Sequence, residues 1–131
     1  MTILVAYVPR PEGQTALDKG IEMAKRGNER LVVVNVSPGG TKDDPSFAEA
    51  HDFERVQKLL EDSGLNAEIK QFVRGHNAVE EMGVLVDSLQ VSVLIIGLRK
   101  RSAVGKLLLG SVAQELLLSI SCPVLAVKVP V

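Results

Sequence analysis

Hydrophobic and polar positions divide the chain into two alternating kinds of segment. The first kind is short, continuously apolar and rich in β-branched residues, and it ends at turn-forming residues, as expected of a strand buried on both faces. Such strands are predicted at residues 3–8, 31–36, 91–96 and 124–129. Residues 66–73 alternate imperfectly, which is typical of a strand with one wetter face at a sheet edge.

The segments between these strands place their apolar residues at helical spacing and their charges on the opposite face, so each is predicted to be an amphipathic helix. The first runs from about residue 15 to 27 and the second from about residue 47 to 60, with Gly64 in the position of a C-terminal cap. The third follows Asn77 as its cap, and the last runs from about residue 111 to 119.

Strands that alternate with helices form parallel βαβ units, and right-handed crossovers place the helices on both faces of the sheet. We therefore predict an α/β fold built on a single doubly wound, parallel, five-stranded sheet. In sheets of this kind, ligands bind beyond the carboxyl ends of the strands, where the strand order reverses. The loops after the first and fourth strands are the expected place for a binding site.

The composition narrows the class of protein. With 131 residues, 46% of them hydrophobic, the chain fits one globular domain over residues 1–131. Fifteen Lys and Arg against sixteen Asp and Glu lack the basic excess that nucleic-acid binding requires. The apolar stretches are shorter than the roughly 20 residues that span a bilayer, no signal-peptide pattern is present, and a single Cys122 makes no internal disulfide. We expect a cytoplasmic protein with no membrane or nucleic-acid partner.

The segment between the fourth strand and the last helix has the ingredients of a phosphate site. Ser111 and Gln114 have the spacing of a capping box, so a helix N-terminus with unpaired backbone N–H groups should lie at Ser111 and attract anions. Gly97 and Gly110 allow a ligand to approach the backbone closely. Four cations fall within eight residues: Arg99, Lys100, Arg101 and Lys106. The residues alone leave open a second interpretation, a solvated basic loop before an ordinary capped helix.

The same segment resembles the signature of the universal stress protein family: a glycine, two residues, a second glycine, nine residues, then glycine and serine or threonine. Gly97, Gly110 and Ser111 match it, and residues 122–124 match the Cys-Pro-Val strand that usually follows. The similarity extends over the whole chain. It implies a Rossmann-like sheet of strand order 3-2-1-4-5, and a homodimer joined through the last strand, Val124 to Val129.

The resemblance also implies a ligand, ATP or another adenine nucleotide, with the phosphates and ribose against the glycine motif and the adenine near the ends of the first two strands. Two positions depart from the pattern, since Lys100 replaces the second glycine and Val8 replaces the aspartate that usually follows the first strand. Arg99 and Lys100 can offset part of this loss by charge-assisted contacts. The predicted ligand-binding residues are Gly97, Arg99, Lys100, Gly110, Ser111, Val112 and Val36.

The sequence therefore leaves two main hypotheses for the function. The first is a stress-response protein that binds an adenine nucleotide and is not an enzyme; the second is a nucleotide-independent, dimeric interaction module whose pocket is closed by Val8 and Lys100. Slow ATP hydrolysis is a third option that lacks a visible general base or metal-binding carboxylate beside the motif. His51 and His76 have no ligand partners at metal-binding spacing, so no catalytic or metal-binding residue is predicted.

Overall fold

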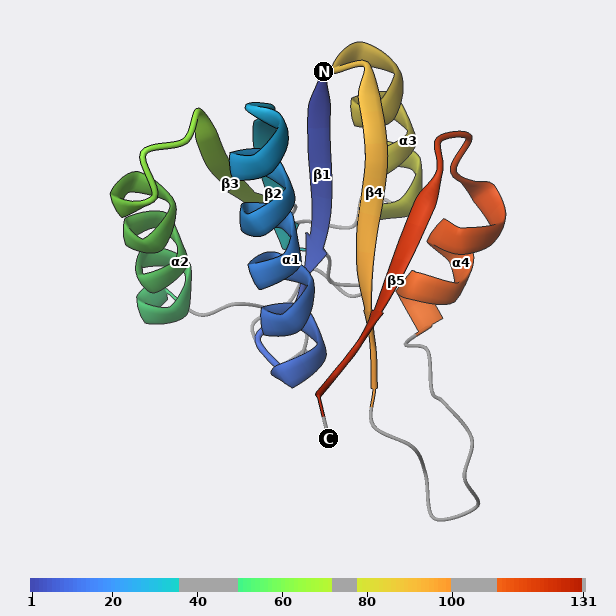
Figure 1. Cartoon of the computed structure of the whole chain (residues 1–131). Helices are drawn as coiled ribbons and strands as arrows, with labels where there is room; N and C mark the ends of the chain where they lie inside the picture. The colour runs from blue at the N-terminus through green and yellow to red at the C-terminus, as the bar shows by residue number, and fades with distance from the viewer. Residues whose placement is uncertain (36–49, 72–77, 100–110, 131) are drawn as a thin grey trace.

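The computed structural model describes residues 1–35, 50–71, 78–99 and 111–130, which form five strands and four helices in strict alternation (Figure 1). Helices α3 and α4 begin at residues whose side chains are outside this description. In chain order the elements are β1 (Thr2–Tyr7), α1 (Pro11–Gly27), β2 (Arg30–Asn35), α2 (Ala50–Asp62), β3 (Ala67–Gln71), α3 (Ala78–Ser88), β4 (Val91–Leu98), α4 (Ser111–Ser119) and β5 (Val124–Lys128).

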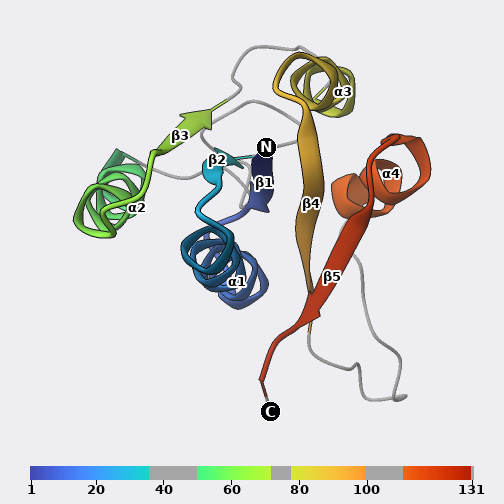
Figure 2. The ribbon, with the colours of Figure 1, turned by 45° about the horizontal axis from the view of Figure 1, so that its top comes forward.

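The strands form one parallel sheet in the order β3-β2-β1-β4-β5. Helices α1 and α2 cover one face of the sheet, and α3 and α4 cover the other (Figure 2). The predicted doubly wound α/β fold and its strand order are confirmed. The strand with the wetter pattern, β3, lies at one edge as expected, and none of its residues is fully buried.

Burial on both faces explains why the central strands are continuously apolar. In β1, Ile3 and Val5 point into the core that α1 and α2 close, whereas Leu4 and Ala6 point into the core that α3 and α4 close. All six residues of β1 are buried. Because successive side chains of a strand point to opposite faces, a strand between two helical layers has no position at which a polar residue meets water.

The first helix begins at Pro11, four residues before the predicted start. Proline is well suited to the first turn of a helix because its fixed φ is already helical and its missing N–H would have no partner there. The backbone N–H of Gln14 donates to the Arg10 carbonyl at 3.0 Å, which closes that turn. The prediction was wrong because Pro11 and Gly13 were interpreted as turn residues.

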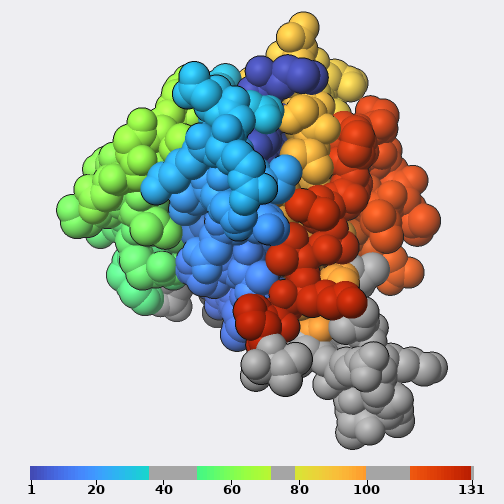
Figure 3. Space-filling view, viewed as in Figure 1, coloured from blue at the N-terminus to red at the C-terminus, as the bar shows by residue number. Residues whose placement is uncertain are grey.

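The far edge of the sheet is formed by β5, which lies beside α4 along one side of the molecule (Figure 3). Strand β5 pairs with β4, and its residues are half-buried or exposed. The predicted last strand is confirmed to within one residue at its end. In the part of the chain described here, no helix has both the length and the apolarity to cross a membrane.

Candidate functional site

The order of the strands locates one expected ligand-binding crevice at the carboxyl edge of the sheet. The chain leaves β1 toward α1 on one face, whereas it leaves β4 toward α4 on the other face. Strands β1 and β4 are neighbours, so their exits diverge between them. This is the topological switch point at which open α/β sheets bind ligands.

Gly97 allows the start of α1 to lie directly on the end of β4. A Cβ added at Gly97 would overlap the backbone carbonyl of Glu12, and one added at Gly13 would overlap the carbonyl of Val8. Neither carbonyl can move as the tip of a flexible side chain can. Gly97 therefore allows the start of α1 to pack against β4, and Gly13 allows the first turn of α1 to lie against the end of β1. Gly97 thus has a packing role independent of any ligand.

Three charged side chains lie together at this crevice. The Oε1 atom of Glu12 is 3.9 Å from Nη1 of Arg10 and 3.9 Å from Nε of Arg99. The Glu12 side chain is only 13% exposed, and its Oε1 atom is buried without a hydrogen-bond partner. Among the described residues it is the sole buried side-chain atom in this condition. A buried acceptor without a donor is costly and rare in native structures, so each instance calls for an explanation.

The other half of the carboxyl edge, over β1, β2 and β3, is fully hydrogen-bonded. Asn35, at the end of β2, is completely buried. Its Nδ2 donates to the Tyr7 carbonyl at 3.1 Å, and its Oδ1 accepts from Nε2 of Gln71 at 3.0 Å. The three residues are register partners across neighbouring strands. This amide ladder ties the ends of three strands together.

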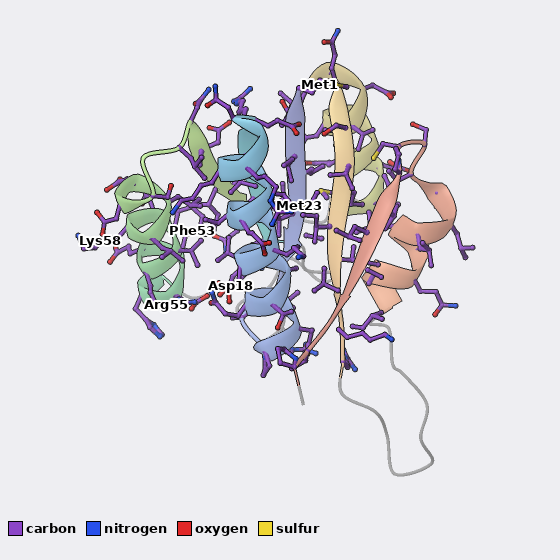
Figure 4. All side chains as sticks on the ribbon, viewed as in Figure 1. Met1, Asp18, Met23, Phe53, Arg55 and Lys58 are labelled. Carbon is purple, nitrogen blue, oxygen red and sulfur yellow. The ribbon has the colours of Figure 1, made fainter. Side chains whose placement is uncertain are left out.

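The Tyr7 hydroxyl extends the same network to α2. It donates to Oδ2 of Asp52 at 2.7 Å and accepts from Nη2 of Arg55 at 3.1 Å. Arg55, which is labelled in Figure 4, also donates to Oε1 of Gln14 on α1. Burial, followed by the hydrogen bond to Asp52, raises the pKa of Tyr7 well above its ordinary value. The hydroxyl therefore stays protonated at physiological pH and acts as a fixed donor.

The structure describes some of the residues that the sequence predicted for ligand binding and leaves others outside its description. Gly97 and Arg99 lie at the switch point, and Ser111 is the first residue of α4, as predicted. The side chains of Ser111 and Val112 are outside the description, and Lys100, Gly110 and Val36 lie outside the described residues altogether. Ligand contacts by all seven residues remain a prediction.

Sequence reasoning missed Arg10, Glu12 and the network around Tyr7. The sequence Pro-Arg-Pro-Glu-Gly was interpreted as a turn. The opposite charges of Arg10 and Glu12 were the one feature of this run that could have indicated a charged site. Their proximity to Arg99 depends on a contact between segments nearly ninety positions apart and has no local pattern. His51 lies on α2 as predicted, and His76 lies outside the described residues. No group of three or more His, Cys, Asp or Glu side chains could hold a metal ion within the described ranges.

The fold and the sequence both match known proteins. The model of the universal stress protein family matches residues 1–128. The chain belongs to the universal stress protein family. A universal stress protein of Mycolicibacterium smegmatis is 47% identical over 126 residues, which cover 96% of each chain.

Solved universal stress proteins share the fold. A structure from Archaeoglobus fulgidus is 26% identical, with a TM-score of 0.76 over 97% of both chains. A second structure from that organism, in complex with dAMP, is 21% identical, with a TM-score of 0.69 over 97% of this chain and 96% of that one. Further universal stress proteins of the same fold were solved with cAMP or with AMP bound. At these lower identities the likeness shows the fold alone.

Proposed function

We propose that this universal stress protein is a stress-response binding protein that takes an adenine nucleotide at the switch point between β1 and β4. The observation that carries the proposal is the location of Gly97 and Arg99, at the end of β4, at that point, in a fold whose relatives contain dAMP, cAMP and AMP. A guanidinium at the rim is suited to a phosphate because its planar donors match the phosphate oxygens.

The proposed contacts are those predicted from the sequence. The phosphates and ribose lie against Gly97, Arg99, Lys100, Gly110, Ser111 and Val112, and the adenine lies near Val36. ATP is one candidate ligand among the adenine nucleotides. We assign the site a binding role rather than a catalytic one, in a single cytoplasmic domain.

Nucleotide binding is tested by calorimetric titration and by thermal melting with ATP, ADP, AMP and cyclic AMP. A ligand that binds only the folded state stabilises it, so millimolar nucleotide should raise the melting temperature by about 2 °C or more. Gly110→Val and Ser111→Ala should abolish the shift, whereas Ser119→Ala, at the opposite end of α4, should retain it. No response to any of the four nucleotides contradicts the proposal.

We also infer a homodimer that pairs β5 of two copies. In β5, Ala126 and Lys128 are exposed, and Leu118 of the adjoining α4 is 79% exposed. An apolar strand with an open edge attracts another strand, and a second copy satisfies it without further components.

Val127→Arg should then give monomers in sedimentation analysis. Val84→Arg is the matched control, because Val84 is an exposed apolar residue on α3, and it should leave the dimer intact. Val127 also packs partly against the core, so circular dichroism must show that each variant is folded. A folded Val127→Arg variant that remains dimeric contradicts the strand-paired dimer.

The second candidate is a nucleotide-independent interaction module. It is favoured by Val8, whose side chain offers no hydrogen-bond acceptor at the end of β1, and by Arg99, which already faces a carboxylate of the same chain. A pull-down that retains the same protein partners with and without added nucleotide supports this module. Partners that are lost or gained when nucleotide is added support the nucleotide-dependent function.

A further inference from the structure

We propose that Glu12 is the residue that recognises the sugar of the bound ligand: its carboxylate accepts hydrogen bonds from ribose hydroxyls, while Arg10 and Arg99 on either side take the phosphate. The inference rests on the proposed nucleotide site and assigns it a selectivity, for ribonucleotides over nucleotides that lack the ribose hydroxyls.

The first step is the position of Glu12. Its backbone lies against Gly97 of β4 so closely that no side chain fits between them, and its carboxylate lies within 3.9 Å of Arg99, the residue that follows β4. The carboxylate therefore lies where β1 and β4 diverge. Arg99 is 41% exposed, so the cluster reaches the surface on that side. Glu12 Oε1 itself is buried, so a ligand reaches it only when the neighbouring side chains move aside.

The second step is the missing hydrogen bond. Both guanidiniums lie 3.9 Å from Glu12 Oε1, beyond the 2.7–3.2 Å at which N–H groups donate. They offset the negative charge of the carboxylate, but neither satisfies its buried oxygen. An ionised carboxylate is an acceptor only, so a partner for Oε1 must be a donor. A hydroxyl of an incoming ligand meets this requirement.

The third step is the combination of charges. The partly exposed guanidinium of Arg99 lies beside the carboxylate, and guanidinium groups favour anionic ligands because they pair with phosphate through parallel N–H···O bonds. A ligand that fits must present hydroxyl donors a few ångströms from an anionic group. A ribose phosphate has this pattern, because its hydroxyls and its phosphate are attached to the same small ring. Inorganic phosphate carries its O–H groups on the anionic phosphorus itself, so it has no hydroxyl separated from the anionic group.

The structural alternative is that Glu12 only stabilises the start of α1. A carboxylate in the first turn of a helix interacts favourably with the helix dipole, and Glu12 is such a residue. This role requires no ligand and produces no discrimination between nucleotides. The two roles can therefore be separated by measuring ligand preference rather than stability.

The experiment compares AMP with 2′,3′-dideoxy-AMP by calorimetric titration of the full chain. Loss of a hydrogen bond to a charged group should weaken binding about tenfold, so the unmodified protein should bind AMP about ten times more tightly. In Glu12→Ala the preference should fall below about twofold, because the acceptor is gone. Glu12→Gln keeps an acceptor oxygen without the charge and should recover part of the preference.

Matched controls separate this effect from a general loss of charge. Glu22→Ala removes an exposed carboxylate of the same helix, which pairs with Lys19 and Arg26, and it should keep the full preference. Arg99→Gln should narrow the difference in affinity between AMP and adenosine, whereas Arg26→Gln should not. If Glu12→Ala does not fold, Glu12→Met replaces it, since methionine has a similar length and no strong acceptor.

The outcomes distinguish this inference from the proposed function. An unmodified protein that binds no nucleotide overturns both. One that binds AMP and dideoxy-AMP equally, or that keeps its preference when Glu12 becomes alanine or methionine, overturns the role of Glu12 and leaves the nucleotide site standing. A preference that disappears with Glu12 and returns in part with glutamine supports the inference.

Discussion

The carboxyl edge of the sheet has two halves, and they differ in how their polar groups are satisfied. Over β1, β2 and β3, the Asn35 side chain donates to the Tyr7 backbone carbonyl and accepts from Gln71, and the Tyr7 hydroxyl donates to Asp52 of α2. Between β1 and β4, the buried Oε1 atom of Glu12 accepts no hydrogen bond. The nearest guanidinium nitrogens of Arg10 and Arg99 each lie 3.9 Å from it. A polar network in which every group is hydrogen-bonded stabilises the fold, whereas a buried polar group without a partner lowers the stability of the folded state. The first half is therefore structural, and the second is where we propose that the ligand is recognised.

The largest effect is expected for Gly97→Ala, which places a Cβ against the backbone of Glu12. Because a backbone carbonyl cannot be displaced cheaply, the free energy of unfolding should fall by about 2 kcal/mol or more. Gly83→Ala on α3 is the control: nothing lies within 4 Å of its added Cβ, so helix propensity should raise stability by about 0.5–1 kcal/mol. Urea unfolding measures both. Equal effects would mean that α1 does not depend on this close approach.

Asn35→Ala should have the next largest effect. It removes the amide that joins Tyr7 to Gln71 and leaves a buried donor and acceptor without this partner, at a cost of about 2 kcal/mol. Gln57→Ala, an exposed change on α2, should alter stability by less than about 0.5 kcal/mol. If Asn35→Ala costs no more than its control, the ladder is not what holds the strand ends.

Tyr7→Phe removes the hydroxyl that links β1 to Asp52 and Arg55, and it should cost about 1 kcal/mol at neutral pH. The pKa of Tyr7 is raised in the folded state, so its contribution is complete below the unfolded value near pH ~10 and is lost as pH rises above it. Above that pH, the difference in unfolding free energy between the unmodified protein and Tyr7→Phe should therefore shrink. Denaturant unfolding at pH values on both sides of 10 checks this, and a constant difference would contradict the assignment.

The smallest effect is expected for Glu12→Gln. Oε1 has no hydrogen bond to lose, and the loose ion pairs with Arg10 and Arg99 are partly exposed, so stability should change by less than about 1 kcal/mol. Melting without ligand measures this change. A loss as large as that of Asn35→Ala would show that Glu12 is part of the structural framework, and the contrast between the two halves would not hold.

Local patterns in the sequence were sufficient for the architecture. Continuous apolar runs, one imperfectly alternating segment and helical spacing predicted the five strands and four helices that the structure describes. The alternation of strands and helices predicted the parallel sheet and its switch point. These features depend on residues within a few positions of one another, where periodicity and turn chemistry act directly. The glycine-serine spacing from Gly97 to Ser111 was likewise local, and it led to the family that the whole-chain match confirms.

Only the tertiary structure decided which side chains meet. The bond from Tyr7 to Asp52 joins residues 45 positions apart, and the approach of Glu12 to Arg99 joins the first helix to the fourth strand. The distance between two segments is set by how the helices pack on the sheet. The residue pattern within either segment therefore does not predict it. The sequence by itself determined that ligands are expected between β1 and β4. Packing of α1 against Gly97 determined that a buried carboxylate oxygen without a hydrogen-bond donor lies there.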